Sequence, residues 1–256
     1  MAMPRRVLPS KAQIGDLIAS GAAGRLVKLL SPRLSRGGIV LDIGSDAVPD
    51  KTVAALYLGL IERSERQVLG EVLCSDYPVI ELGAGVGSVT LAIAEHIRPE
   101  CGMLLVEANP RLAPWWQHNV ALSTRKDLQF LNVAAASGSQ QRVRFILEPA
   151  LLGSRVAGQG DARAVDVEAL SIPEIHRRSG FERFSLVCDI EGAEFSLLQE
   201  SGTGAFLAAC QSIVMEMHPE KGRETQRLVE LFAEAGLVHV VTRHAVYGFV
   251  RRAPLP

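Results

Sequence analysis

The stretch Val79-Ile80-Glu81-Leu82-Gly83-Ala84-Gly85-Val86-Gly87 decides the fold of this chain. Its first residues predict a buried strand, and the apolar run that follows Ser88 predicts a helix. Glycines at 83, 85 and 87 allow the turn between them to bend sharply and to approach a ligand closely, because no Cβ stands in the way. A strand, a glycine turn and a helix in this order are typical of a site for a nucleoside cofactor.

Position 88 distinguishes between two classes of adenosine cofactor. The dinucleotide fingerprint G-x-G-x-x-G needs a glycine there for close packing of helix on strand, and it holds a pyrophosphate at the helix N-terminus. This chain has Ser88 instead. The spacing G-x-G-x-G behind Glu81 suits S-adenosylmethionine, which has no phosphate and carries an ammonium and a sulfonium group that a carboxylate can pair with. The pattern therefore favours S-adenosylmethionine over NAD.

A second acid follows the next predicted strand. The run Met103-Leu104-Leu105-Val106 is apolar, and Glu107 comes directly after it. A carboxylate at the end of this strand can accept hydrogen bonds from both hydroxyls of a ribose. Enzymes that use NAD also place an acid here. Glu107 therefore indicates adenosine, and the glycine spacing decides between the adenosine ligands.

Composition and charge suit a single soluble enzyme domain. The chain has 256 residues, of which 48% are hydrophobic, enough to cover both faces of a parallel sheet. Its net charge of −1 gives no overall basic surface for nucleic acid. No apolar run has the length of a membrane span or the position of a signal peptide. The cysteines lack C-x-x-C spacing and are typical of a reduced, cytoplasmic protein: Cys74, Cys101, Cys188 and Cys210.

The N-terminal part differs from the rest of the chain. Residues 1–38 hold seven Lys and Arg against one Asp, an excess of six, which we interpret as a solvated arm. Attraction to an anionic substrate or membrane surface, and a homodimer built through the arm, stay open. Residues 38–44 predict a strand and a turn, and apolar spacings of three and four over 52–73 predict a helical cap that leans over the glycine turn. We therefore divide the chain into an arm and cap (1–76) and a cofactor-binding domain (77–256).

From Tyr77 onward strands and helices alternate, which predicts a parallel sheet with helices on both faces. A Gly-, Ser-, Gln- and Arg-rich stretch over 137–165 interrupts the alternation as a hairpin or loose loop. The fold class is therefore α/β, with a doubly wound, mostly parallel seven-stranded, Rossmann-like sheet that ends in an antiparallel hairpin. Strands are expected over 78–82, 103–107, 128–133, 184–188, 212–217, 237–242 and 246–251, and helices over 87–97, 111–122, 171–179, 193–200 and 221–235, the last ended by Gly236.

Acids and one histidine gather where two of these strands end. Asp189 and Glu191 follow the strand 184–188 and share a face by period-two alternation, while Glu194 falls in the first turn of the next helix, where an acid suits the helix dipole. Glu216 and His218 stand at the end of the following strand. Ligands of open α/β sheets bind beyond the carboxyl ends of the strands, where the strand order reverses. Glu81 and Asp189 are then expected to face each other across one crevice.

Taken together, five segments resemble FkbM-type S-adenosylmethionine-dependent methyltransferases, and the resemblance runs from about Thr52 to the C-terminus. The D-x-E-G-x-E segment at Asp189–Glu194 is the most specific of them, since methyltransferases in general share the glycine turn. The chain departs from the family at Ala84-Gly85-Val86, where Ala-Asn is common, and its first fifty residues match no segment of the family. The five segments are Glu81–Gly87, Val106–Pro110, Asn132–Gly138, Asp189–Glu194 and Glu216–Pro219.

The resemblance implies a class I methyltransferase that transfers a methyl group to oxygen, typically a hydroxyl of a sugar or secondary metabolite. Such a reaction needs a held acceptor and a base for its proton. We assign Asp189 or His218 as the base, with Glu191 and Glu216 orienting the acceptor or the base. On the cofactor side we expect Glu81 at the amino-acid moiety, Gly83, Ala84, Gly85 and Gly87 along the ligand, Glu107 at the ribose and Ala134 and Ala135 beside adenine, and Ala108, Asn109 and Asp189 complete this set.

Several alternatives stay open. Asp189, Glu191, Glu216 and His218 have the oxygen and imidazole ligands that suit a magnesium or manganese ion, although nothing in their spacing requires one. A non-catalytic module for regulation or assembly would keep the cofactor acids and have no use for Asp189 and His218. An NAD-dependent oxidoreductase is disfavoured by Ser88, and a nucleic-acid methyltransferase by the neutral charge and the lack of a Pro-Pro-Tyr-like strand end. Glycan, polyketide and lipid-linked acceptors all remain candidates.

Overall fold

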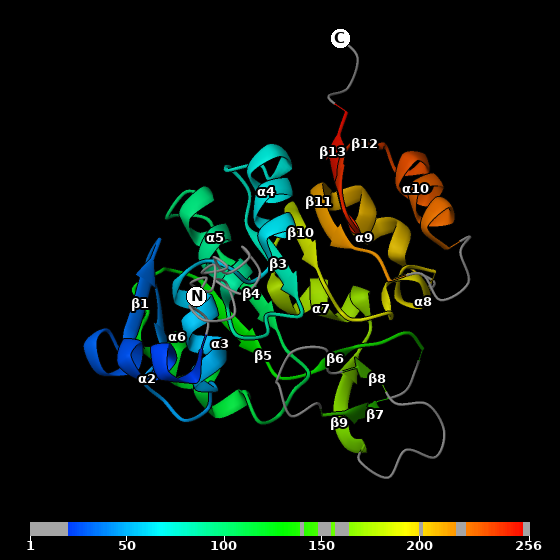
Figure 1. Cartoon of the computed structure of the whole chain (residues 1–256). Helices are drawn as coiled ribbons and strands as arrows, with labels where there is room; N and C mark the ends of the chain where they lie inside the picture. The colour runs from blue at the N-terminus through cyan, green and yellow to red at the C-terminus, as the bar shows by residue number, and fades with distance from the viewer. Residues whose placement is uncertain are drawn as a thin grey trace, which may run out of the picture.

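A computed structural model describes residues 20–138, 141–147, 155–156, 164–199, 202–218 and 224–252. Its centre is a seven-stranded sheet in the order β12-β13-β11-β10-β3-β4-β5 (Figure 1). Five strands run parallel, while β13 pairs antiparallel with both β11 and β12. The strands are β3 (Val79–Leu82), β4 (Met103–Val106), β5 (Leu128–Leu131), β10 (Phe184–Cys188), β11 (Cys210–Glu216), β12 (Leu237–Arg243) and β13 (Val246–Arg251).

Helices cover both faces of this sheet, so the predicted doubly wound fold with a terminal antiparallel hairpin is confirmed. Every residue of β3, β4 and β10 is buried, as continuous apolar strands between two helical layers must be. One face carries α4 (Arg63–Val72), α5 (Ser88–His96) and α6 (Ala113–Leu122), and the other carries α7 (Ile172–Ser179), α8 (Glu194–Leu198), α9 (Thr203–Ala209) and α10 (Glu224–Glu234).

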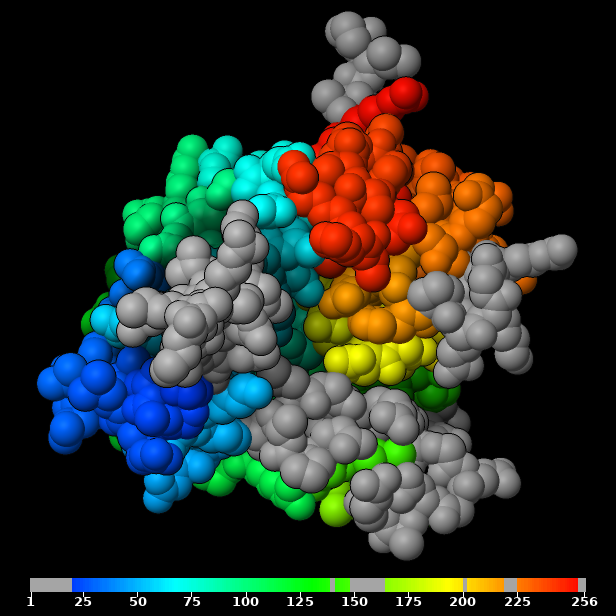
Figure 2. Space-filling model, in the orientation of Figure 1, coloured from blue at the N-terminus to red at the C-terminus, as the bar shows by residue number. Residues whose placement is uncertain are grey.

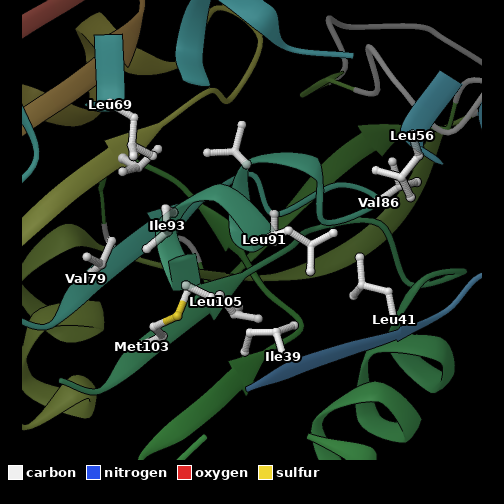
Figure 3. Close-up of a cluster of buried hydrophobic side chains, with 14 of the residues drawn as sticks. Ile39, Leu41, Leu56, Leu69, Val79, Val86, Leu91, Ile93, Met103 and Leu105 are labelled. Atoms are coloured by element: carbon white, nitrogen blue, oxygen red, sulfur yellow. The ribbon is translucent and has the colours of Figure 1, made fainter. Parts of the chain in front are cut away.

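Successive strand residues contribute to the two cores in turn, because neighbouring side chains on a strand point to opposite faces. Val79, Met103 and Leu105 belong to the core beneath α4 and α5, where Leu69 and Ile93 meet them (Figure 3). The intervening strand residues, among them Ile80, Leu82 and Leu104, belong to the core beneath α7 to α10. No helix among the described residues is long and apolar enough to cross a membrane.

The N-terminal part is more ordered than a solvated arm. Residues 1–19 lie outside the described residues, but α2 (Gly21–Leu30) and β1 (Arg33–Arg36) occupy the second half of the predicted arm. Ser20 caps α2, because its hydroxyl accepts a hydrogen bond from the N–H of Ala23 at 3.2 Å. The strand β1 pairs antiparallel with β2 (Ile39–Asp42), the strand predicted over 38–44. In Figure 2 the blue surface of α2 and the red surface of the terminal hairpin lie at different sides of the visible face.

The helical segment predicted over 52–73 forms two helices, α3 (Asp50–Tyr57) and α4. Residues 58–62 break the helix, and Glu62 adopts φ 52°, the left-handed region that glutamate rarely enters. The helix α4 packs against β11, β12 and β13, so this part of the chain contributes to one face of the sheet. The sequence pattern could not locate the break, because its apolar spacing runs on across Ile61.

The interruption between β5 and β10 contains a small second sheet of β6 (Ala134–Ala135), β9 (Ala164–Leu170), β7 (Arg142–Ile146) and β8 (Arg155–Val156), in that order. The antiparallel pair of β7 and β8, which are consecutive in the chain, agrees with the hairpin expected over 137–165, and β9 pairs antiparallel with the other edge of β7. Besides α2 and β1, the sequence did not predict the end of β9 over 166–170 or the helix α9, which contains Gly204 and starts after Gly202. Residues 139–140, 148–154 and 157–163 lie outside the described part of the chain.

Candidate functional site

A cavity of about 250 Å³ opens beyond the carboxyl ends of β3, β4 and β10. The strands β3 and β10 are neighbours in the sheet. The strand that pairs with β3 on its other side is β4, and the strand that pairs with β10 on its other side is β11, so the strand order reverses between β3 and β10. One end of the cavity is apolar and the other is acidic. Its lining consists of Ile61, Glu62, Glu65, Gly83, Gly85, Val106, Glu107, Ala108, Val133, Ala134, Ala135, Phe145, Asp189, Ile190, Glu191, Ala193 and Glu216.

The glycine turn forms the floor of the cavity, and two of its glycines serve different needs. Gly83 has φ 88°, and a Cβ there would lie 1.8 Å from the carbonyl oxygen of Asp189, so the two strand ends approach as closely as backbone allows. Gly85 has φ 49°, and a Cβ there would meet no atom closer than 4.0 Å. Gly83 is required by the fold, whereas Gly85 keeps the cavity itself open.

Glu107 joins the end of β4 to the glycine turn. Its carboxylate accepts hydrogen bonds from the N–H groups of Gly85 at 2.8 Å and Asn109 at 2.7 Å. The side chain is 7% exposed, and this burial raises its pKa while the backbone donors lower it. Each carboxylate oxygen can accept a second hydrogen bond. Glu107 therefore has acceptor capacity left for a ligand in the cavity that it lines.

The other cofactor candidates divide into two groups. Ala108, Ala134 and Ala135 line the apolar end with Val133 and Phe145, as a flat adenine ring would require. Other candidates lie outside the lining: Ala84, Gly87, Asn109 and Glu81.

Glu81 differs most from its expected place. Its carboxylate, 2% exposed, accepts a hydrogen bond from Oγ1 of Thr90 on α5 at 2.7 Å. Burial raises the pKa of Glu81 well above its ordinary value. Glu81 lies on β3 and Asp189 directly follows the adjacent strand β10, in which Val187 is the register partner of Glu81. Only Asp189 of the two lines the cavity, so the two acids do not face each other across it.

Asp189 directly follows β10 and is one of the acids that line the cavity. Its backbone N–H donates to the carbonyl of Leu82 at 3.0 Å, which continues the pairing of β10 with β3. Its Oδ1 atom is buried and has no hydrogen-bond partner among the described residues. Burial raises the pKa of this carboxyl to about 7, and the neighbouring charge of Glu191 acts in the same direction. A buried carboxyl with a vacant acceptor oxygen and a pKa near neutrality is suited to take up a proton.

His218 is fixed at the rim by an acid from another element. Its Nδ1 lies 3.0 Å from Oε1 of Glu194, while its Nε2 lies 3.7 Å from carboxylate oxygens of both Glu191 and Glu216. The hydrogen bond to Glu194 is the largest of the interactions that raise the pKa of His218 to about 9. The imidazole is therefore protonated at neutral pH. A protonated imidazole can act as a cation and a hydrogen-bond donor, but not as a base.

Three of these residues also have the arrangement of a metal site. One ligand atom each of Asp189, Glu216 and His218 lies within 4.8 Å of the others. Glu191, the fourth predicted ligand, is not part of this group. A metal can bind Nε2 of His218 only after the imidazole has lost its proton, and the surrounding carboxylates hold that proton in place.

Two further acids line the cavity and were not predicted as site residues. Glu62 immediately precedes α4, and Glu65 lies in its first turn. Burial raises the pKa of Glu62 to about 8 and that of Glu65 to about 7. The available signal was the presence of two acids three residues apart in the middle of the predicted helical segment.

Glu62 also contacts the first turn of α5. Hydrogen bonds that involve the side chain of Ser88 and the backbone of Val89 lower the pKa of its carboxyl. A dinucleotide pyrophosphate would sit at this helix N-terminus. The carboxyl of Glu62 already occupies this place, which disfavours NAD.

Comparisons with known proteins agree with this geometry. A family model described as the methyltransferase FkbM domain matches residues 81–238. No curated protein sequence matches the chain. Similar solved structures include a precorrin-6y C5,15-methyltransferase from Geobacter metallireducens, with a TM-score of 0.40, 13% identity and coverage of 73% of this chain and 87% of that one. They also include a fibrillarin from Aeropyrum pernix in complex with S-adenosyl-L-methionine, with a TM-score of 0.38, 16% identity and coverage of 77% and 74%.

Proposed function

Because the chain belongs to the FkbM family of S-adenosylmethionine-dependent methyltransferases, we propose that it methylates a hydroxyl oxygen of a sugar or secondary metabolite. The observation that carries the oxygen-directed part is Asp189. Asp189 lines the cavity, its buried Oδ1 atom has no hydrogen-bond partner among the described residues, and its carboxyl has a pKa near 7, where it can remove the proton of a hydroxyl.

S-adenosylmethionine, when bound, supplies a methyl group that is already activated for transfer. The residues of the chain then have two tasks, to place the acceptor and to remove its proton. Asp189 accepts the proton on Oδ1. His218, held by Glu194, donates from Nε2 at the rim, and Glu191 and Glu216 beside it accept hydrogen bonds from further hydroxyls of the acceptor. One hydrogen-bond donor and two acceptors at the rim suit an acceptor molecule with several hydroxyl groups.

The cofactor would occupy the remainder of the cavity. Glu107 would accept hydrogen bonds from the ribose hydroxyls, Gly83 and Gly85 would lie along the ligand, and Ala108, Ala134 and Ala135, which also line the cavity, would contact the adenine. The acceptor end presents carboxylates from α4, the end of β10 and the end of β11, namely Glu65, Asp189, Glu191 and Glu216. Anionic acceptors such as phosphates and carboxylates would be repelled there.

The test is methyl transfer from S-adenosylmethionine labelled with ¹³C in its methyl group to a panel of neutral sugars and polyols. The proposal expects a labelled methyl ether, which carbon NMR distinguishes from a methyl group on nitrogen or carbon. Labelled product on nitrogen or carbon alone would contradict the oxygen-directed reaction. Binding of S-adenosylhomocysteine with no transfer to any acceptor class would favour the non-catalytic module.

A metal-assisted version of the same reaction is a second candidate, favoured by the spacing of Asp189, Glu216 and His218. It differs in its response to chelators. Loss of transfer in EDTA with recovery in magnesium or manganese would support it, and unchanged transfer would exclude it.

A further inference from the structure

Glu62 lies where a charged part of a cofactor would be recognised, although it stands outside every motif of the family match, which begins at residue 81. It immediately precedes α4 and lines the same cavity as Gly83 and Gly85. The segment is held against α5, since Oγ of Ser88 donates to the carbonyl of Ile61 at 3.3 Å. The backbone beside Glu62 is therefore fixed against the first turn of α5, directly after the glycine turn.

The acidic lining of the cavity favours a ligand that carries a positive charge. Its described lining contains acids from four segments and no Lys, Arg or His: Glu62, Glu65, Glu107, Asp189, Glu191 and Glu216. Burial and the charges of Asp189 and Glu65 all oppose ionisation of Glu62. A ligand with a positive group favours the ionised form of Glu62, because it pairs with a carboxylate that is already removed from water. S-adenosylmethionine brings two such groups, and its product retains the ammonium.

The acid of the glycine motif is unsuited to this contact. Glu81 is buried on β3 with its carboxylate bonded to Thr90 at 2.7 Å, and it lies outside the lining. Reaching the cavity would require Glu81 to leave this hydrogen bond, whereas Glu62 already lines the cavity.

We propose that Glu62 recognises the α-ammonium group of S-adenosylmethionine, so that the segment before α4, rather than the glycine motif, selects ligands that carry the amino-acid moiety. The inference rests on the cofactor pocket of the proposed function. It assigns the ligand's charged end to the side of the cavity formed by α4 and the first turn of α5, and it leaves Glu81 with a structural role.

The experiment compares two ligands by calorimetry. S-adenosylhomocysteine contains the ammonium, whereas 5′-methylthioadenosine has the same adenosine and thioether without the amino-acid moiety. Glu62→Gln preserves size and removes the charge, and Glu81→Gln is the matched control in the glycine motif. For Glu62→Gln we expect affinity for S-adenosylhomocysteine to fall about tenfold to hundredfold, the value of a hydrogen bond to a charged group. Affinity for 5′-methylthioadenosine should stay within about twofold.

Each other outcome has a definite meaning. Glu81→Gln should change both affinities to the same extent, so a selective loss of S-adenosylhomocysteine in that variant would overturn the assignment. Unchanged binding by Glu62→Gln, or equal loss of both ligands in a variant whose circular dichroism matches wild type, would also overturn it. If the wild-type protein binds neither ligand, the cofactor pocket itself is refuted and the role of Glu62 falls with it.

Discussion

The carboxylate of Glu194 lies 3.0 Å from Nδ1 of His218, although 24 residues separate them in the chain. The side chain of Glu194 is 2% exposed, and its Oε1 also accepts from the N–H groups of Gly192 at 3.1 Å and Ile190 at 3.4 Å. One buried acid thus organises the loop after β10 and fixes the imidazole after β11. Glu194 is in the first turn of α8, as expected for a dipole partner, but its main contacts are with the site.

Glu194→Ala should lower the free energy of unfolding by about 3–5 kcal/mol, because it leaves a half-buried imidazolium and two backbone donors without their partner. Glu194→Gln, which retains an acceptor oxygen, should cost less. Chemical denaturation measures both. Ser196→Ala is the control, since it alters the same helix at an exposed hydroxyl bonded to Ala193, and it should stay within about 0.5 kcal/mol. A similar cost for Ala at 194 and at 196 would contradict this role of Glu194.

Asp189→Asn should lower the rate of methyl transfer by about 10²-fold or more, since it removes the proposed base and retains the size of the side chain. Affinity for S-adenosylhomocysteine should change by less than about threefold, because the Asp189 carboxyl is assigned to the acceptor. Steady-state kinetics and calorimetry separate the two effects. A full rate of transfer in this variant would remove Asp189 from the mechanism.

The pH dependence of transfer follows from the same carboxyl. A base works only when deprotonated, and the pKa of Asp189 is raised to about 7, so the rate should rise with pH through neutrality and level off above it. Asp189→Asn should lack this rise in its residual activity. A rate that is flat between pH 6 and 8 in the wild-type protein would place the base elsewhere.

Stability should show a separate effect of His218. Its pKa is raised from 6.5 to about 9, so the folded state binds the proton more tightly than the unfolded state does. The resulting stability is fully present below pH 6.5 and is lost as pH rises through 9. Unfolding free energies across this range should fall more steeply for wild type than for His218→Asn. Because Glu62 and Glu65, with raised pKa values, act in the same direction, the difference between the two proteins is the informative quantity.

The chain order of apolar runs and glycines predicted most of the fold. Strands such as β3 and β4 are short apolar runs bounded by turn residues, so period and length identify them without tertiary information. The break between α3 and α4 was not predictable in this way. It depends on Glu62 in the left-handed region, a conformation held by contacts with α5 that sequence spacing does not contain.

The sequence predicted the strand-end residues of the candidate site but not the place of every side chain. The strand-end residues Asp189, Glu191 and Glu216 lie together in the lining because parallel strands bring their carboxyl ends to one edge. The prediction placed Glu81 in the cofactor site because its position two residues before the turn does not reveal which way its side chain points. On β3 it faces the α5 side and meets Thr90.

The glycine turn offers a matched pair of substitutions. Gly83→Ala should prevent folding or cost more than about 3 kcal/mol, since its Cβ would lie 1.8 Å from the carbonyl oxygen of Asp189. Gly85→Ala meets no neighbour and should cost only about 1 kcal/mol for its positive φ, yet its methyl group would narrow the cofactor cavity. We expect Gly83→Ala to lower the temperature of thermal unfolding, and Gly85→Ala to lower the affinity measured by cofactor titration. Equal stability of the two would contradict the close approach of the strand ends.

The central claim is that the cavity at the ends of β3, β4 and β10 binds S-adenosylmethionine. Calorimetric titration of the purified protein with S-adenosylhomocysteine tests it most directly, with NAD titrated in parallel. The account predicts saturable binding of S-adenosylhomocysteine with a dissociation constant on the order of micromolar, and no binding of NAD, whose pyrophosphate would meet Glu62 at the start of α5. Binding of NAD alone, or of neither ligand, would contradict it.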